Sequence, residues 1–286
     1  QRLSLMRRGL NDLTPHQLTM TATPIPRTLS MVAYADLDCS VIDELPPGRK
    51  PITTALIDAA RREQVIDRVG RACRESRQAY WVCALIEESD ALQANAAEMT
   101  ATQLSEALTD LKIGLLHGRL SADEKAEIMA EFAAGRLDIL VATTVIEVGV
   151  DVPNASMMII ENAERFGLAQ LHQLRGRVGR GAIESHCLLM YQSPLSQTAK
   201  QRLAVMRESQ DGFVIAEKDL SIRGPGEVLG PRQTGLSSFR VARLPEHEAL
   251  LGTAQTVAEE LVRDDPERAE QIESRWTRAR EAFAHV

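Results

Sequence analysis

Strand-like and helix-like patterns alternate along the middle of the chain, and this alternation is the strongest constraint on its fold. Short, nearly continuous apolar runs, typical of strands buried on both faces, occur at AYWVCALI (79–86), DILVAT (138–143), SMMII (156–160) and HCLLMY (186–191). Segments with helical patterns lie between them. Strands that alternate with helices pair in parallel, because each helix returns the chain to the start of the next strand. The pattern therefore predicts an α/β fold, with a parallel sheet and helices on both of its faces.

Local signals mark the individual helices. Ser121 and Glu124 form an S-x-x-E capping box, and Gly135 supplies the C-terminal stop of the helix that follows. Another helix is expected from about Asp90 to Leu111, leading into IGLLHG. Helical spacing of apolar residues predicts two more, one that begins near Leu168 and one that contains Val65, Ile66, Val69 and Cys73.

The segment HQLRGRVGRG (172–181) continues the helical pattern that begins near Leu168, yet it contains glycines. Glycine inside a helix costs about 1 kcal/mol relative to alanine, so Gly176 and Gly179 indicate that something approaches this backbone closely. Arg177 and Arg180 are three residues apart, which on a helix puts both on one face. Two guanidinium groups on one face can bind phosphate oxygens in pairs and stabilise charge on a transferring phosphoryl group. A solvated basic turn is the alternative that this segment alone leaves open.

Composition and charge restrict the classes of function. The chain has 286 residues and a net charge of −7, which argues against nonspecific coating of nucleic acid. Its basic residues are concentrated, however, with 12 Lys and Arg against 6 Asp and Glu between Arg165 and Arg243. Four scattered cysteines, without histidines at zinc spacing, indicate neither a metal site nor a disulfide framework. The lack of a signal peptide and of an apolar run of roughly 20 residues predicts a cytoplasmic protein without a membrane partner.

The segments that flank the alternating region have different patterns. HQLTMTATPIPRT (16–28) is expected to form one strand and its exit loop, and the Pro- and Gly-rich DELPPGRKP (43–51) predicts a linker at a domain boundary. After Tyr191 we expect a helical hairpin that turns near Gly212, followed by a glycine-rich loop. The tail from Pro245 is expected to be helical and is acidic.

Several long motifs, in their expected order, resemble those of superfamily 2 helicases. TATPIPRTL (21–29) is similar to motif III, LVATTVIEVGVDVPNA (140–155) to motif V, and QLHQLRGRVGRG (170–181) to motif VI. YADLDCSVIDELPPGR (34–49) resembles the interdomain connection of bacterial fork-remodelling helicases, and GFVIAEKDLSIRGPGEVLGPRQTG (212–235) resembles their TRG translocation segment. The resemblance implies a RecA-like P-loop NTPase fold, followed by a helical hairpin and C-terminal helices.

The resemblance also implies nucleotide-binding roles. In the family, motif VI faces an ATP held by the other RecA-like domain, so Arg177 and Arg180 would be arginine fingers and Gln173 a nearby polar contact. Motif V would place Gly149 and Asp151 near the nucleotide. For Asp151, the start of an ordinary turn before Val152-Pro153 is the alternative.

Other residues would contact DNA or couple hydrolysis to movement. By resemblance, Thr143 would contact the DNA backbone, while Thr21 and Thr23 of motif III would act in coupling. In the TRG segment, polar links would tie the hairpin to the motor and convert domain closure into a stroke along duplex DNA; these would come from Arg202, Arg223 and Gln233. The alternatives are an ordinary strand end for Thr143 and a surface hairpin with solvated charge.

The motifs predict four parts of the chain. They are the end of a first RecA-like motor domain with motif III and the linker (1–50), a second RecA-like helicase C-terminal domain with motifs IV to VI (51–195), the TRG hairpin and translocation loop (196–243), and a C-terminal helical tail (244–286). The sequence contains no GxxxxGK[ST] loop and begins with Gln1, so we expect a piece that does not hydrolyse ATP alone. VIDE (41–44) resembles a magnesium-binding strand end, but it follows motif III and runs into prolines, which favours a charged linker.

The resemblance implies ATP and Mg²⁺ as cofactors, held mainly by a first motor domain that this sequence lacks. It implies branched double-stranded DNA, including forks and Holliday junctions, as the partner, together with an N-terminal wedge domain that is also lacking. The parent protein would remodel stalled forks and recombination intermediates in DNA repair. Two alternatives stay open: the corresponding part of a transcription-repair coupling translocase, and a nonhydrolytic RecA-like interaction module.

Overall fold

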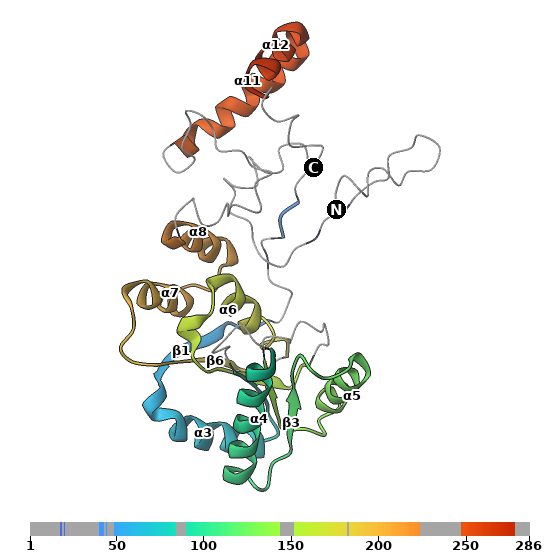
Figure 1. The fold of residues 1–286 in the computed structure, drawn as a ribbon, viewed down its shortest axis with the longest axis vertical. Helices are drawn as coiled ribbons and strands as arrows, with labels where there is room; N and C mark the ends of the chain where they lie inside the picture. The colour runs from blue at the N-terminus through green and yellow to red at the C-terminus, as the bar shows by residue number, and fades with distance from the viewer. Residues whose placement is uncertain are drawn as a thin grey trace. The chain divides into compact units, whose positions relative to one another are not determined.

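The computed structural model describes residues 49–83, 90–143, 152–181, 183–223 and 247–277, together with positions 18, 20, 40–42 and 44. The chain divides into two compact units, Gln1–Pro24 with Leu45–Asp219 and Ile25–Glu44 with Leu220–Val286. The sheet lies in the first unit (Figure 1). The strand expected within 16–28 and most of the linker at 43–51 lie outside the described residues.

The described residues form one six-stranded sheet in which every neighbouring pair is parallel, as predicted. Its order is β1-β6-β5-β2-β4-β3. The strands are β1 (Ile52–Asp58), β2 (Gln78–Val82), β3 (Ile113–Leu116), β4 (Ile139–Ala142), β5 (Ala155–Ile160) and β6 (Ser185–Tyr191). Strand β1 was not predicted. It follows the proline-rich linker and has two threonines near its start, and it becomes a strand by pairing with β6 from Ile52↔Ser185 to Asp58↔Tyr191.

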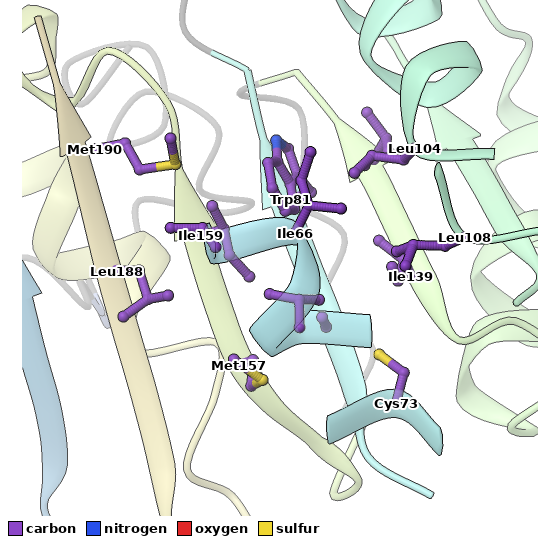
Figure 2. Packing of buried hydrophobic residues seen from close by; sticks show 14 of the residues in the cluster. Ile66, Cys73, Trp81, Leu104, Leu108, Ile139, Met157, Ile159, Leu188 and Met190 are labelled. Carbon is purple, nitrogen blue, oxygen red and sulfur yellow. The ribbon is translucent and has the colours of Figure 1, made fainter. Parts of the chain in front are cut away.

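One face of the sheet is covered by α3 (Arg62–Arg74), which follows the short η1 (Ala59–Arg61), and by α4 (Asp90–Ala107). The predicted apolar stripe of α3 is buried, and Leu104 and Leu108 extend the same core. Figure 2 shows Trp81, Ile159 and Leu188 of three strands in this layer, with Ile66 over them. Since these four side chains are all less than 9% exposed, hydrophobic burial holds this layer together.

The opposite face carries α5 (Ala122–Ala133), α6 (Leu168–Arg175) and α7 (Gln197–Glu208). Tyr80 of β2 packs edge-on against Phe132 of α5, with ring centroids 4.9 Å apart. Gln78 Nε2 donates to the main-chain oxygens of Phe132 and Leu137 at 2.6 and 2.7 Å. Helices therefore cover both faces of the sheet, as predicted.

Helix α5 confirms the capping box. Ser121 N donates to Glu124 Oε2 at 2.8 Å, Glu124 N donates to Ser121 Oγ at 3.3 Å, and Gly135 follows the helix with a φ of +71°. Helix α4 ends at Ala107, earlier than predicted, because Leu111 N bonds the Leu108 oxygen in a tighter turn.

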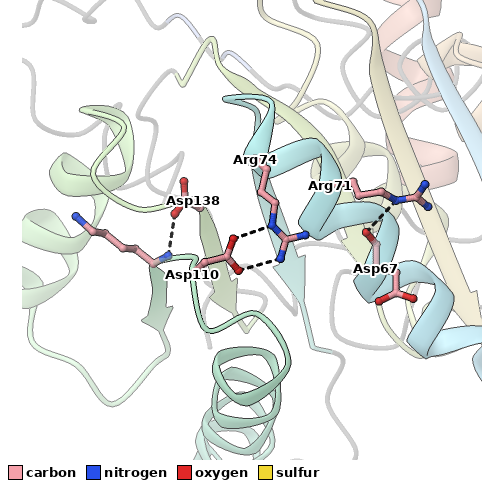
Figure 3. A network of polar contacts seen from close by, with 6 residues as sticks. Asp67, Arg71, Arg74, Asp110 and Asp138 are labelled. Atoms are coloured by element: carbon pink, nitrogen blue, oxygen red, sulfur yellow. Dashed lines mark hydrogen bonds and ion pairs between the residues drawn. The ribbon is translucent and has the colours of Figure 1, made fainter.

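A surface network lies at the end of α3 (Figure 3). Arg74 Nε and Nη2 donate to the two carboxylate oxygens of Asp110 at 2.7 and 2.8 Å, and Asp138 accepts from Lys112 N at 2.8 Å. The Arg74 hydrogen bond lowers the pKa of Asp110 to about 2. Both side chains are about half exposed, so this pair orders the α4–β3 turn but adds little stability.

After β6 the alternation stops, as expected, and α7 is followed by α8 (Gly212–Arg223). Ser196 caps α7 by accepting from Ala199 N, and Asp211 accepts from Phe213 N at the start of α8. In the second unit η3 (Glu248–Leu250), α11 (Leu251–Asp264) and α12 (Pro266–Thr277) form the expected helical tail. The predicted glycine-rich loop lies outside the described residues.

Candidate functional site

Helix α6 ends before the two predicted arginine fingers. Its last residue is Arg175, Gly176 caps it, and Arg177 N bonds the Leu174 oxygen in a final turn. The prediction that Arg177 and Arg180 share a helical face is therefore wrong. The reason is Gly179, whose φ of +77° lies in the left-handed region, where a right-handed helix cannot continue.

The predicted residues nonetheless lie away from the core. Gln173 and Arg180 are exposed and Arg177 is half-buried, whereas Arg175 is 2% exposed. Arg177 and Arg180 thus lie on an open turn rather than on a helix. We call residues 176–181 the motif VI turn.

The glycines of this turn are explained by the protein itself. A Cβ on Gly179 would lie 2.9 Å from Ile52 Cγ1, and one on Gly181 would lie 2.5 Å from the Pro153 oxygen. The prediction that something comes close to this backbone is confirmed, but at these two positions the neighbours are β1 and the chain before β5. Gly176 is less constrained, since its nearest neighbours are ordinary contacts at 3.4 Å or more.

The motif VI turn lies beside the segment that leads into β1. Arg49 Nη2 donates to the Gly176 oxygen at 3.3 Å, and Gly179 lies against Ile52 and Ser185, the first residues of β1 and β6. We call this end of the sheet, where its strands begin, the amino edge. The arginines therefore lie close to the point where the preceding part of the chain enters the sheet.

Thr143 lies at the opposite end of the sheet, where its strands end, which we call the carboxyl edge. It follows β4, its amide donates to the Leu116 oxygen at 3.2 Å, and it is 2% exposed. Its Oγ1 is buried and has no hydrogen-bond partner among the described residues. The predicted strand end is confirmed, whereas the structure separates Thr143 from Arg177 and Arg180 by the length of the sheet.

Arg202 joins α7 to the segment before α6. Its Nη1 donates to the Phe166 oxygen and its Nη2 to the Glu164 oxygen, both at 3.0 Å, at the end of η2 (Ala163–Arg165). Two main-chain acceptors hold the guanidinium in a fixed direction. The first helix of the hairpin is thus tied to the sheet domain through Arg202.

Several predicted residues are not placed. The described residues do not include Thr21, Thr23, Gly149, Asp151 or Gln233. Arg223 is the last residue of α8, and its side chain is not described.

Sequence reasoning missed the role of Arg175. Its Nη1 donates to the oxygens of Met206 and Ser209 at 2.8 and 2.9 Å, and its Nη2 lies 3.1 Å from His172 Nδ1. Helical spacing could have revealed it, because Arg175 is four residues after the buried Leu171 and lies on the same face.

A second missed cluster lies at the carboxyl edge. Glu161 Oε1 accepts from Arg62 Nε at 2.7 Å and from Trp81 Nε1 at 3.0 Å, and the Arg62 guanidinium lies 5.6 Å from the centre of the Trp81 ring. Burial raises the pKa of the adjacent Cys83 to about 12, and the Glu161 charge acts in the same direction. This thiol is therefore protonated and inert, and the cluster stabilises the ends of β2 and β5.

Within the described ranges, no three His, Cys, Asp or Glu side chains are grouped so as to hold a metal ion. No helix in those ranges has the length and apolar character to cross a bilayer.

The sheet and the motif VI turn define the class of protein, a RecA-like helicase C-terminal domain. Residues 74–182 match the family model for the helicase conserved C-terminal domain, and residues 209–282 match that for ATP-dependent DNA helicase RecG, domain 3, C-terminal. The chain belongs to the RecG family and corresponds to a C-terminal portion of its members.

Relatives and a solved structure support this membership. Over its full length the chain is 60% identical to the ATP-dependent DNA helicase RecG of Escherichia coli (strain K12), of which it covers 42%. It is 47% identical to that of Bacillus subtilis (strain 168), with 93% of this chain and 38% of the relative aligned. A structure of RecG bound to a three-way DNA junction is 50% identical, covers 80% of this chain and 30% of that chain, and has a TM-score of 0.65. The chain thus spans less than half the length of these relatives.

Proposed function

We propose that this chain is the C-terminal motor portion of an ATP-dependent DNA helicase that translocates on double-stranded DNA and remodels stalled forks and branched recombination intermediates. The observation that carries the proposal is the motif VI turn, which holds Arg177 and Arg180 at the surface beside the segment that enters β1. Its relatives are named ATP-dependent DNA helicases, and one solved relative is bound to a three-way DNA junction.

In the proposed motor, a first RecA-like domain that precedes this chain holds most of the ATP and Mg²⁺. Arg177 and Arg180 donate to the terminal phosphate oxygens across the gap between the domains, which stabilises the charge that develops during phosphoryl transfer. Gln173 is exposed on the last turn of α6 and adds a polar contact. Gly149 and Asp151 are proposed to lie near the same nucleotide.

The proposed DNA path uses other residues. Thr143 is proposed to contact the DNA backbone at the carboxyl edge, which requires its side chain, 2% exposed in this structure, to become accessible when DNA binds. Thr21 and Thr23 are proposed to couple hydrolysis to movement. Movement then passes to the hairpin and its loop through Arg202, Arg223 and Gln233. Branched duplex DNA is the proposed partner, and the cytoplasm is the proposed location because the named relatives are bacterial DNA helicases.

The test is phosphate release in the presence of forked DNA, measured for the full-length protein, for this chain alone and for this chain mixed with the preceding portion. We expect turnover from the full-length protein and from the mixture, and none from this chain alone. Arg180→Ala in the full-length protein should reduce turnover by about a thousandfold or more, the usual contribution of an arginine finger.

The matched control is Arg136→Ala, which removes an exposed arginine that pairs with Glu131 on α5. It should leave turnover unchanged. Two results would contradict the proposal: hydrolysis by this chain alone at the full-length rate, or full-length turnover that is insensitive to both Arg177→Ala and Arg180→Ala. A mixture without activity would favour a nonhydrolytic interaction module.

A further inference from the structure

Three segments meet at the amino edge of the sheet. The chain entering β1 contributes Arg49 and Ile52, the end of α6 contributes Arg175 and Gly176, and the end of α7 with its following turn contributes Met206–Gln210. Arg49 donates to the Gly176 oxygen at 3.3 Å, and Ile52 N donates to Gln210 Oε1 at 3.0 Å. We call this meeting point the α6–α7 junction.

Arg175 is the centre of the junction. Its buried guanidinium donates to the Met206 and Ser209 oxygens, which lie at the end of α7, where a helix carries partial negative charge. The same Nη1 atom also donates to Oγ1 of Thr54 in β1, at 3.4 Å. Arg175 thus bonds to main-chain, hydroxyl and imidazole acceptors.

A buried cation is a costly way to fill space. Moving a guanidinium out of water carries a large desolvation penalty, and an apolar side chain would pack α6 against α7 without it. Arginine provides directional hydrogen bonds, which an apolar side chain cannot, because its planar donors fix the positions of two α7 oxygens relative to α6. Arg175 is also two residues before Arg177, so it joins the motif VI turn to the hairpin over a short distance.

We propose that Arg175 is a positioning residue that makes the α7 helix follow the motif VI turn, so that nucleotide-dependent movement of Arg177 and Arg180 reaches the hairpin. This inference rests on the proposed function. Gln210 assists by linking the same α7 end to Ile52. The link made by Arg202 is different, because it joins α7 to η2 and not to the motif VI turn.

The test uses the full-length protein with Arg175→Lys. A lysine keeps the positive charge, but its single ammonium cannot reproduce the spread of donors that reaches the α7 oxygens and His172 together. Two quantities are measured: DNA-stimulated ATP hydrolysis, and displacement of a third strand from duplex DNA per ATP hydrolysed. We expect kcat and KM for ATP to change by less than about threefold and displacement per ATP to fall about tenfold, within the usual range for coupling between sites. The matched control, Arg207→Lys, changes an exposed arginine on α7 and should alter neither quantity.

A second pair of variants covers the case in which Arg175→Lys does not fold. Gln210 is exposed, so Gln210→Ala should fold and lower displacement per ATP by about threefold, whereas Gln210→Glu keeps an acceptor for Ile52 N and should preserve it. Unchanged displacement per ATP in both Arg175→Lys and Gln210→Ala would overturn the inference. An equal loss of hydrolysis and displacement would overturn it too, because it would show a structural role alone. If the unmodified protein neither hydrolyses ATP nor displaces the strand, the proposed function itself fails, and the inference fails with it.

Discussion

A Cβ atom on Gly179 would lie 2.9 Å from Cγ1 of Ile52, the first residue of β1. The glycine also has a φ of +77°, a conformation that side chains with a Cβ rarely adopt. The motif VI turn is therefore shaped by two constraints at one residue, close packing against the sheet and a left-handed backbone. Both constraints fix the backbone of Gly179, and they therefore set the direction of Arg180, the next residue.

Gly179→Ala should lower the free energy of unfolding by about 2 to 3 kcal/mol, because it adds backbone strain and a clash with Ile52. Urea unfolding followed by Trp81 fluorescence in a Trp276→Phe background measures this change. Gly176→Ala is the matched control within the same turn. Gly176 has an ordinary φ of −66°, so alanine there should be neutral or stabilise by up to about 1 kcal/mol. Equal effects of the two substitutions would show that the backbone of Gly179 is not constrained.

Ser121→Ala should destabilise the sheet domain by about 1 kcal/mol, because α5 loses the hydroxyl that accepts from Glu124 N. Ser105→Ala is the control. The Ser105 hydroxyl donates to the Ala101 oxygen within α4, where alanine is the better helix former. Thermal unfolding of both variants by circular dichroism tests the prediction, which is wrong if Ser105→Ala is the more damaging change.

Glu161→Ala should cost about 2 kcal/mol of stability, since it leaves the Trp81 indole N–H and the half-buried Arg62 without their shared acceptor. Glu161→Gln keeps a neutral acceptor and should cost less. Glu131→Ala removes the exposed partner of Arg136 and should cost under about 1 kcal/mol. Urea midpoints rank the three variants, and an equal loss in Glu131→Ala and Glu161→Ala would contradict the role of burial.

Stability should fall as pH decreases below about 6.5, in part because of His172. Burial, followed by the nearby Arg175 charge, lowers the pKa of His172 in the folded chain below its ordinary value of 6.5. Arg175 Nη2 can only donate, so His172 Nδ1 must accept and the ring must be neutral. As pH falls past 6.5, the unfolded chain takes up a proton that the folded chain does not, and unfolding becomes easier.

His172→Gln keeps a possible acceptor for Arg175 but removes the titration. Its free energy of unfolding should therefore depend less on pH between 7.5 and 5.5 than that of the unmodified chain. Burial also lowers the pKa of His186, so adding His186→Gln should flatten the dependence further. A steeper dependence in His172→Gln would reverse the assigned direction of the pKa change.

Local signals in the sequence predicted most of the sheet domain. The apolar runs became β2, β4, β5 and β6, and the Ser121 box begins α5 where expected, because each of these features depends on residues close in sequence. Strand β1 was missed since its identity comes from pairing with β6, more than a hundred residues away. The early end of α6 was missed for a related reason: the turn that follows it packs Gly179 against Ile52, which is more than a hundred residues away in sequence.

The candidate site was predictable through motifs and less so through contacts. Resemblance drew attention to Gln173, Arg177 and Arg180, which lie away from the core. Arg175 and Arg202 both donate to main-chain oxygens of distant segments. Every residue carries such an oxygen, so the sequence does not indicate which of them will accept these hydrogen bonds.

Among the described strands, β1 has β6 as its single neighbour. On a translating ribosome, Ile52 emerges long before Ser185, and at bacterial elongation rates the delay is roughly ten seconds. Throughout that interval β1, the earliest of the described strands, lacks its partner strand, while β2, β3 and β4 can already pair with one another. Completion of this domain during synthesis is therefore timed by the arrival of its last strand, and until then β1 is open to binding by a chaperone.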